Sequence, residues 1–119
     1  MINARREFED HVRGKEVLCS KIMFRDRKVF HRDNDKLIVL HKNYTADDYE
    51  IFLESLNFEY EQGYKNTPQN LFGQIWYIDG TWSDRSEAET AEWWTYRTRP
   101  EIPEECGGED TLIKGSGRY

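Results

Sequence analysis

The chain has 119 residues, 34% of them charged and 37% hydrophobic, so it can form one small domain but holds few aliphatic side chains for a core. Aromatic residues, at 14%, offset that shortage because each buried ring removes roughly 150–250 Å² from water, and this favours a small folded domain over a disordered chain. The net charge is −6, no apolar run approaches the roughly 20 residues that cross a bilayer, and the N-terminus has no apolar signal segment, so we expect a cytoplasmic protein without a membrane partner.

The first predicted element is a short N-terminal helix over Ala4–Val12. Asn3 precedes it and can cap its first turn, and Phe8 and Val12 lie one turn apart as a narrow apolar stripe. His11 falls among Arg and Glu residues of the same helix. We therefore interpret His11 as a solvated helix residue.

Strands are predicted next. Residues Glu16–Phe24 are rich in apolar and β-branched side chains, and a hairpin should follow with Val29–His31 and Leu37–His41 as its arms. Asp33–Asp35 would form the turn between them. Leu37–Leu40 is apolar at every position, which is typical of a central strand covered by a helix on one side.

The clearest helix is predicted over residues 45–57. Thr45 is its N-cap, and Asp48 stands at the third helical position, where it can complete a capping box. The apolar residues at helical spacing form one core-facing stripe: Tyr49, Phe52, Leu53 and Leu56. Residues 58–62 then alternate apolar and polar side chains, which predicts a half-buried strand with Phe58 and Tyr60 facing inward.

All four tryptophans lie in the stretch Leu71–Tyr96. At its centre, Asp79-Gly80 stands between two runs of β-formers, which predicts a two-residue type I′ hairpin turn. One face of that hairpin would carry Ile75, Tyr77 and Trp82, and the other Trp76 and Ile78.

Residues 86–92 are predicted to form a loop or a helical turn before a last strand over residues 92–98. In that strand Trp94 and Tyr96 share one side, and Trp93 shares the other with Thr95 and Arg97. The elements together predict an α+β fold: a mostly antiparallel sheet of about six to seven strands, with the amphipathic helix 45–57 packed on it and the short N-terminal helix. Residues 1–103 would form this domain, and residues 104–119 a mobile acidic, Gly-rich tail.

The segment Phe52–Glu104 contains the motifs WYIDGTW and EWW, followed by PEIPEE. It resembles a family of small uncharacterised proteins of tailed phages and prophages with a WxxDGTW…EWW…PxIP pattern. The chain departs from that pattern in the loop GYKNTPQN and in SEAET, and residues 1–44 carry little of it. The resemblance implies a virus-encoded protein inside a bacterial host cell, and it implies no catalytic activity.

The chemistry of the side chains also indicates that the protein is not an enzyme. There is no GxSxG nucleophile motif and no Gly-rich phosphate loop. Cys19 and Cys106 form no metal-binding or redox spacing, so both are expected to be free thiols, with a disulfide between them as the alternative. His31 and His41 would lie on neighbouring hairpin arms, where exposed or hydrogen-bonded histidines are commoner than metal ligands. We expect no cofactor and no metal.

Acidic charge is concentrated in the second part of the chain. Residues 1–45 carry 11 Lys and Arg against 7 Asp and Glu, a charge of +4, whereas residues 46–119 carry 6 against 16, a charge of −10. This distribution argues against binding nucleic acid phosphates over the whole surface and suggests an acidic face that meets a basic partner. Acidity that serves solubility alone would give the same numbers.

Exposed Trp and Tyr beside Arg are typical of protein-binding hot spots, and around these rings Asp and Glu outnumber Arg. We therefore predict a phage-encoded accessory protein that binds and inhibits a host protein with a basic surface, such as a defence or nucleic-acid-processing enzyme. The expected partner-binding residues are Trp82, Asp84, Arg85, Glu87, Glu89, Glu92, Trp93 and Arg97.

The alternative is a single-stranded nucleic-acid-binding protein that stacks bases on the aromatic sheet. Its basic residues would be Arg5, Arg6, Arg25, Arg27, Lys28 and Arg32. The acidic surroundings of the tryptophans make nucleic acid the less favoured partner. A third possibility is a structural role as a homodimer joined along the edge of the aromatic hairpin.

Overall fold

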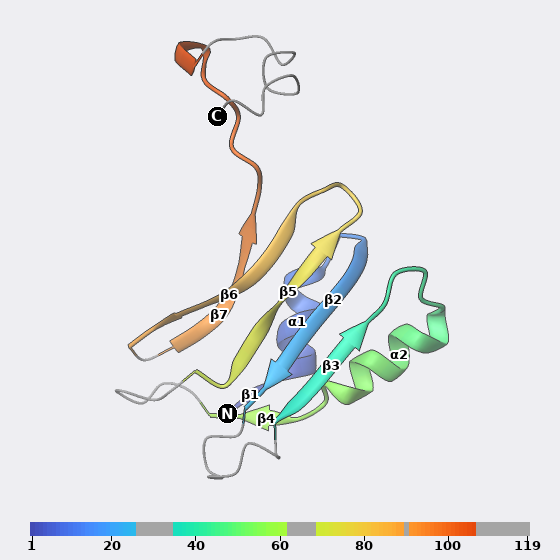
Figure 1. The fold of residues 1–119 in the computed structure, drawn as a ribbon. Helices are drawn as coiled ribbons and strands as arrows, with labels where there is room; N and C mark the ends of the chain where they lie inside the picture. The colour runs from blue at the N-terminus through green and yellow to red at the C-terminus, as the bar shows by residue number, and fades with distance from the viewer. Residues whose placement is uncertain (26–34, 62–68, 90, 107–119) are drawn as a thin grey trace.

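The computed structural model describes residues 1–25, 35–61, 69–89 and 91–106 (Figure 1). The main sheet is antiparallel, in the order β3-β2-β5-β6-β7. Its strands are β2 (Val17–Phe24), β3 (Lys36–Leu40), β5 (Leu71–Tyr77), β6 (Trp82–Ala88) and β7 (Ala91–Arg97). The other elements are a separate pair of strands, β1 (Ile2–Asn3) and β4 (Glu59–Tyr60), the helices α1 (Ala4–Val12) and α2 (Ala46–Ser55), and a 3₁₀ turn, η2 (Glu104–Cys106).

The predicted α+β class with a mostly antiparallel sheet is confirmed. The described strands form a five-stranded and a two-stranded sheet, whereas one sheet of about six to seven strands was expected. The difference arises at β4, which pairs with β1 through Ile2 and Tyr60 instead of joining the main sheet. The expected arm Val29–His31 and the tail beyond residue 106 lie outside the described residues.

Local signals placed both helices correctly. The side chain of Asn3 accepts a hydrogen bond from the Arg6 backbone N–H at 2.9 Å, which caps α1. Thr45 and Asp48 form the expected capping box at the start of α2, since each side chain accepts from the other residue's backbone N–H at 3.0–3.1 Å.

Both helices pack on the same side of the main sheet, and α1 lies behind the sheet in Figure 1. Phe8 of α1 and Phe52 of α2 meet edge to face, with ring centroids 5.2 Å apart, above the buried strand residues. The fully buried apolar residues beneath them include Ile22, Ile75 and Tyr77. The core therefore lies between this helix layer and one face of the sheet.

The predicted two-residue turn at Asp79-Gly80 is wrong. Trp76 pairs directly with Trp82, and Gly80, at φ +90°, ends a loop in which its N–H donates to the carbonyl of Tyr77 at 3.1 Å. This is a three-residue loop with the glycine at a bulge, which the same Asp-Gly signal also permits. A change of register by one residue reverses every side chain on β6. Trp82 therefore lies with Trp76 on the face away from the helices.

Ser83 takes the core position that was expected for Trp82. Its hydroxyl lies 2.7 Å from the buried hydroxyl of Tyr77, so this register supplies a hydrogen-bond partner for the phenol. An indole in that position could not accept a hydrogen bond from the Tyr77 hydroxyl, because its N–H is a donor only.

The prediction of a loop or helical turn over residues 86–92 is also wrong. β6 continues to Ala88, and β7 already begins at Ala91. The hydroxyls of Ser86 and Thr95 lie 2.7 Å apart across the two strands, and Arg85 pairs with Trp94. These cross-strand contacts stabilise a strand that its own acidic and small residues do not favour. The assignment of alternate sides in β7 is confirmed, since Trp94 is buried and Trp93 is exposed.

Strand β3 occupies an edge of the main sheet rather than its centre. Its apolar residues alternate as an edge strand requires, with Ile38 and Leu40 in the core and Leu37 and Val39 exposed. Its continuous hydrophobicity therefore does not arise from burial on both faces.

Candidate functional site

The side of the main sheet that faces away from the helices, here called the open face, carries most of the tryptophans. Two of its cross-strand rows run over four or five strands each. The first row contains Cys19, Trp76, Trp82 and Arg97, and the second contains Val39, Lys21, Gln74, Asp84 and Thr95. Leu37, Met23 and Phe72 form a third row, and Trp93 lies on β7, where its side chain is 42% exposed.

The charges on the open face are few and nearly balanced. Among the described residues of its rows, Lys21 and Arg97 are basic and Asp84 is acidic. Arg97 Nε lies 3.0 Å from an oxygen of Asp84, so these two charges neutralise each other. At the border of the face, Arg25 lies over the ring of Phe72, 5.7 Å from its centroid. The open face is therefore mainly aromatic and apolar.

The structure brings four of the eight predicted partner-binding residues together on the open face: Trp82, Asp84, Trp93 and Arg97. Glu87 is exposed but faces the helix side, opposite Glu92, and Glu89 is exposed at the β6–β7 turn. The side chains of Arg85 and Glu92 are only 1% and 3% exposed, so neither belongs to an accessible surface.

Sequence reasoning missed several residues of the open face, including Lys21, Met23, Phe72 and Trp76. The alternation within β2 and β5 could have grouped them. Their alignment with β6 and β7 depends on the hairpin register, which was predicted one residue out of place.

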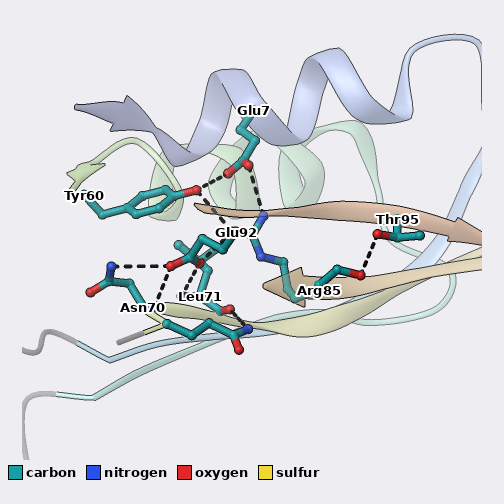
Figure 2. A network of polar contacts seen from close by, with 9 residues as sticks. Glu7, Tyr60, Asn70, Leu71, Arg85, Glu92 and Thr95 are labelled. Carbon is teal, nitrogen blue, oxygen red and sulfur yellow. Dashed lines mark hydrogen bonds and ion pairs between the residues drawn. The ribbon is translucent and has the colours of Figure 1, made fainter. Parts of the chain in front are cut away.

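Arg85 and Glu92 belong to a buried polar network (Figure 2). Arg85 Nη2 lies 2.6 Å from Glu92 Oε1, and Arg85 Nη1 lies 3.1 Å from Glu7 Oε2 on α1. Tyr60 donates to the other oxygen of Glu7 at 2.5 Å. Burial disfavours the charged guanidinium, but Glu7 and the other partners outweigh it and raise the pKa of Arg85. Burial also disfavours the charged form of Tyr60, and for a phenol this raises the pKa, so the Tyr60 hydroxyl remains a donor.

Glu92 has a second role in this network, because it replaces a missing strand partner. The β5–β6 ladder ends at Gln74 and Asp84, beyond which the two strands separate. At that point the Glu92 carboxylate accepts from the backbone N–H groups of Asn70 and Leu71 at 2.8 and 2.9 Å. One carboxylate thus fixes the start of β5 to the β6–β7 hairpin.

His11 is part of a second cluster, and the prediction that it is solvated is wrong. Its Nε2 lies 2.8 Å from the Ser83 hydroxyl, and its ring stacks on Tyr96 with centroids 4.1 Å apart. A Ser–His pair is the arrangement of an activated nucleophile. Ser83 is 0% exposed, however, so no substrate reaches its hydroxyl, and the pair connects α1 to the sheet.

The His11 cluster predicts a dependence of stability on pH. Burial, and then the charge of Arg85, lower the pKa of His11 below its ordinary 6.5. The unfolded chain therefore takes up a proton that the folded form resists, so stability that is present above about pH 6.5 is lost as the pH falls below that value. His11→Gln removes the titration and keeps a donor for Ser83. We expect thermal unfolding to show a smaller loss between about pH 7.5 and 5.5 in this variant than in the wild type. Equal losses in the two proteins would contradict the assignment.

Other features add no second chemical site within the described residues. No three His, Cys, Asp or Glu residues there are placed to hold a metal ion, and Cys19 and Cys106 are free. Neither α1 nor α2 is long and apolar enough to cross a membrane, and this holds for every helix in the described ranges. Comparison with protein-family models, curated proteins and solved structures finds no match.

Proposed function

We propose that this chain is a non-enzymatic, phage-encoded accessory protein that binds a host protein through the open face and thereby inhibits it. The observation that carries the proposal is a set of three tryptophans on a sheet face that neither helix covers: Trp76 pairs with Trp82, and the exposed Trp93 lies two cross-strand rows away, opposite Ser86. Tryptophans next to an Arg form the hot spots of protein interfaces. The resemblance of the sequence to phage proteins supports the viral origin and the bacterial host.

A protein partner suits the β2–β3 part of the open face. Leu37, Val39 and Met23 continue the surface away from the tryptophans, and aliphatic side chains contact other apolar side chains better than they stack on bases. The acidic surplus lies elsewhere, since the exposed Asp and Glu of both helices are on the opposite layer. These residues are Glu9, Asp10, Asp47, Asp48, Glu50 and Glu54. The proposal therefore does not require the partner to be basic where it meets the open face.

The test compares two exposed side chains of which only one lies on the open face. Trp93→Ala removes a hot-spot indole, and we expect at least a tenfold loss of the host protein recovered by affinity capture, because truncating such a residue costs about 2 kcal/mol or more. Asp47→Ala is the control, since Asp47 is exposed on α2, in the helix layer, and its replacement should leave recovery unchanged. A partner that is recovered equally with both variants would contradict binding through the open face.

A single-stranded nucleic acid is the second candidate ligand for the same face. It is favoured by Lys21 and Arg97 among the tryptophans, because basic residues beside stacking rings bind single strands. Of the predicted basic residues, Arg5 does not contribute there, because it binds Glu50 and Glu54 on the helix layer. Arg25 does lie at the border of the face, over the ring of Phe72. Arg27, Lys28 and Arg32 lie outside the described residues. Tryptophan quenching by an oligonucleotide at about 50 mM salt, weakening as salt rises, would favour this candidate over a protein.

A further inference from the structure

A groove runs between the edge strand β3 and the helix α2, which lies beside it in Figure 1. Its volume is about 350 Å³, and β3 together with the turn that follows it lines one wall. The other wall is formed by α2, including Ile51, Phe52 and Ser55. Within the described ranges β3 pairs only with β2, so its outer backbone edge presents unpaired N–H and C=O groups to the groove.

Most of this edge lacks the features that usually prevent strand pairing, which are charges, prolines or bulges. β3 has one charge, Lys36 at its first position, whereas Leu37–Leu40 contains no charge and no proline and pairs with β2 in continuous register. Leu37 is 61% exposed and Val39 is 39% exposed. On the helix side of the same groove, Ile51 is 66% exposed. Apolar side chains therefore flank the open edge on both of its sides.

We propose that this groove binds an extended apolar segment of a partner protein, which pairs with β3 as a sixth strand and packs on α2. The backbone of such a segment supplies the alternating donors and acceptors that the edge of β3 requires. Its side chains point alternately to the two faces of the sheet, so one set contacts Ile51 and the other continues beyond Leu37 and Val39. The proposal does not depend on what the open face binds.

The size and charge of the groove select a short segment rather than a second copy of this chain. Three exposed apolar side chains are few compared with the roughly 20–30 residues on each side of a stable protein interface. Lys42 and Asp48 are the charged side chains among the residues that line the groove, and their opposite signs leave it without a net charge. Glu50 and Glu54 are held by Arg5, each at 2.9 Å. An uncharged segment therefore matches the site.

The test adds a capped seven-residue peptide, in which valine alternates with threonine, to the full chain. Its binding is measured through the backbone amide chemical shifts of β3. We expect Ile51→Lys to raise the dissociation constant at least tenfold, because it places an ammonium group against the apolar side chains of the peptide. The matched control is Ile78→Lys, since Ile78 is nearly as exposed but lies in the β5–β6 loop, and its dissociation constant should stay within about twofold of the wild type.

Four results would each overturn the proposal. The first is equal peptide affinity of Ile51→Lys and the wild type, and the second is a set of amide shifts confined to β7. The third is the absence of any amide shift at about 1 mM peptide, and the fourth is a wild-type dimer that Ile51→Lys converts to a monomer. The last of these would assign the groove to a second copy. Trp93→Ala should leave peptide binding unchanged, so failure of this proposal is distinguishable from failure of the binding function of the open face.

Discussion

Replacing Arg85 with methionine is expected to lower the free energy of unfolding by about 3–5 kcal/mol, because the variant leaves buried carboxylates without their cation. Glu92 is only 3% exposed and Glu7 18% exposed, so solvent cannot replace the guanidinium at either residue. The methionine matches the length of the arginine stem, which limits the cavity contribution. Chemical denaturation of both proteins at neutral pH measures the difference.

The matched control for this prediction is Arg97→Met. Arg97 and Asp84 also form an ion pair at 3.0 Å, but their side chains are 47% and 32% exposed. Water screens such a pair, so the expected loss is below about 1 kcal/mol. If the two variants lose the same stability, the buried network does not hold the hairpin in the way proposed.

Replacing Gly73 with alanine should destabilise the protein by about 2–5 kcal/mol, through a steric clash and backbone strain together. A Cβ at this position would lie 2.4 Å from the Lys21 carbonyl oxygen and 2.9 Å from the Ile22 Cα. Both atoms belong to the backbone of β2, the strand paired with β5, so the clash cannot be relieved by a side-chain movement. The φ of +154° at Gly73 adds strain for any residue with a Cβ.

Gly80→Ala isolates the backbone contribution to that effect. Gly80 also has a positive φ, +90°, but a Cβ there meets no atom within 4 Å. Its expected cost is about 1–2 kcal/mol, which is the usual penalty of the left-handed conformation alone. Urea unfolding compares the two variants. If Gly73→Ala proves as stable as Gly80→Ala, β2 and β5 separate more easily than their pairing implies.

The parts of the fold that depend on neighbours in sequence were predictable. Asn3 and Thr45 cap their helices through bonds to residues three positions away, and the stripe that includes Phe52 follows helical spacing. The alternation within β7 likewise placed Trp93 and Trp94 on opposite sides.

Features set by the pairing of strands were not predictable in the same way. Asp79-Gly80 is compatible with a two-residue and a three-residue loop, and the contacts of Ser83 with Tyr77 and His11 favour the second. The run Leu37–Leu40 has the composition of a central strand, and no local signal shows that among the described strands it pairs on one side alone. The tryptophan content indicated an aromatic surface, but not which side of the sheet would carry each ring.

The charged residues of the candidate site illustrate the same limit. Arg85 and Glu92 stand in an acidic stretch that reads as solvated, yet they are enclosed with each other. Their burial depends on Glu7, Tyr60 and the backbone at Leu71, none of which lies near them in sequence. Composition reveals the excess of acidic residues, but not that one of them, Glu92, is buried.

The buried network also bears on the order of events as the polypeptide is synthesised. Glu7 and Arg85 are 78 positions apart, and Glu92 follows Arg85 by another seven. The ribosome must therefore release nearly the whole described chain before these charges can meet, and contacts of such long range slow folding. Until then α1 cannot form its ion pair with Arg85, so we expect the β6–β7 hairpin to complete the molecule late in folding.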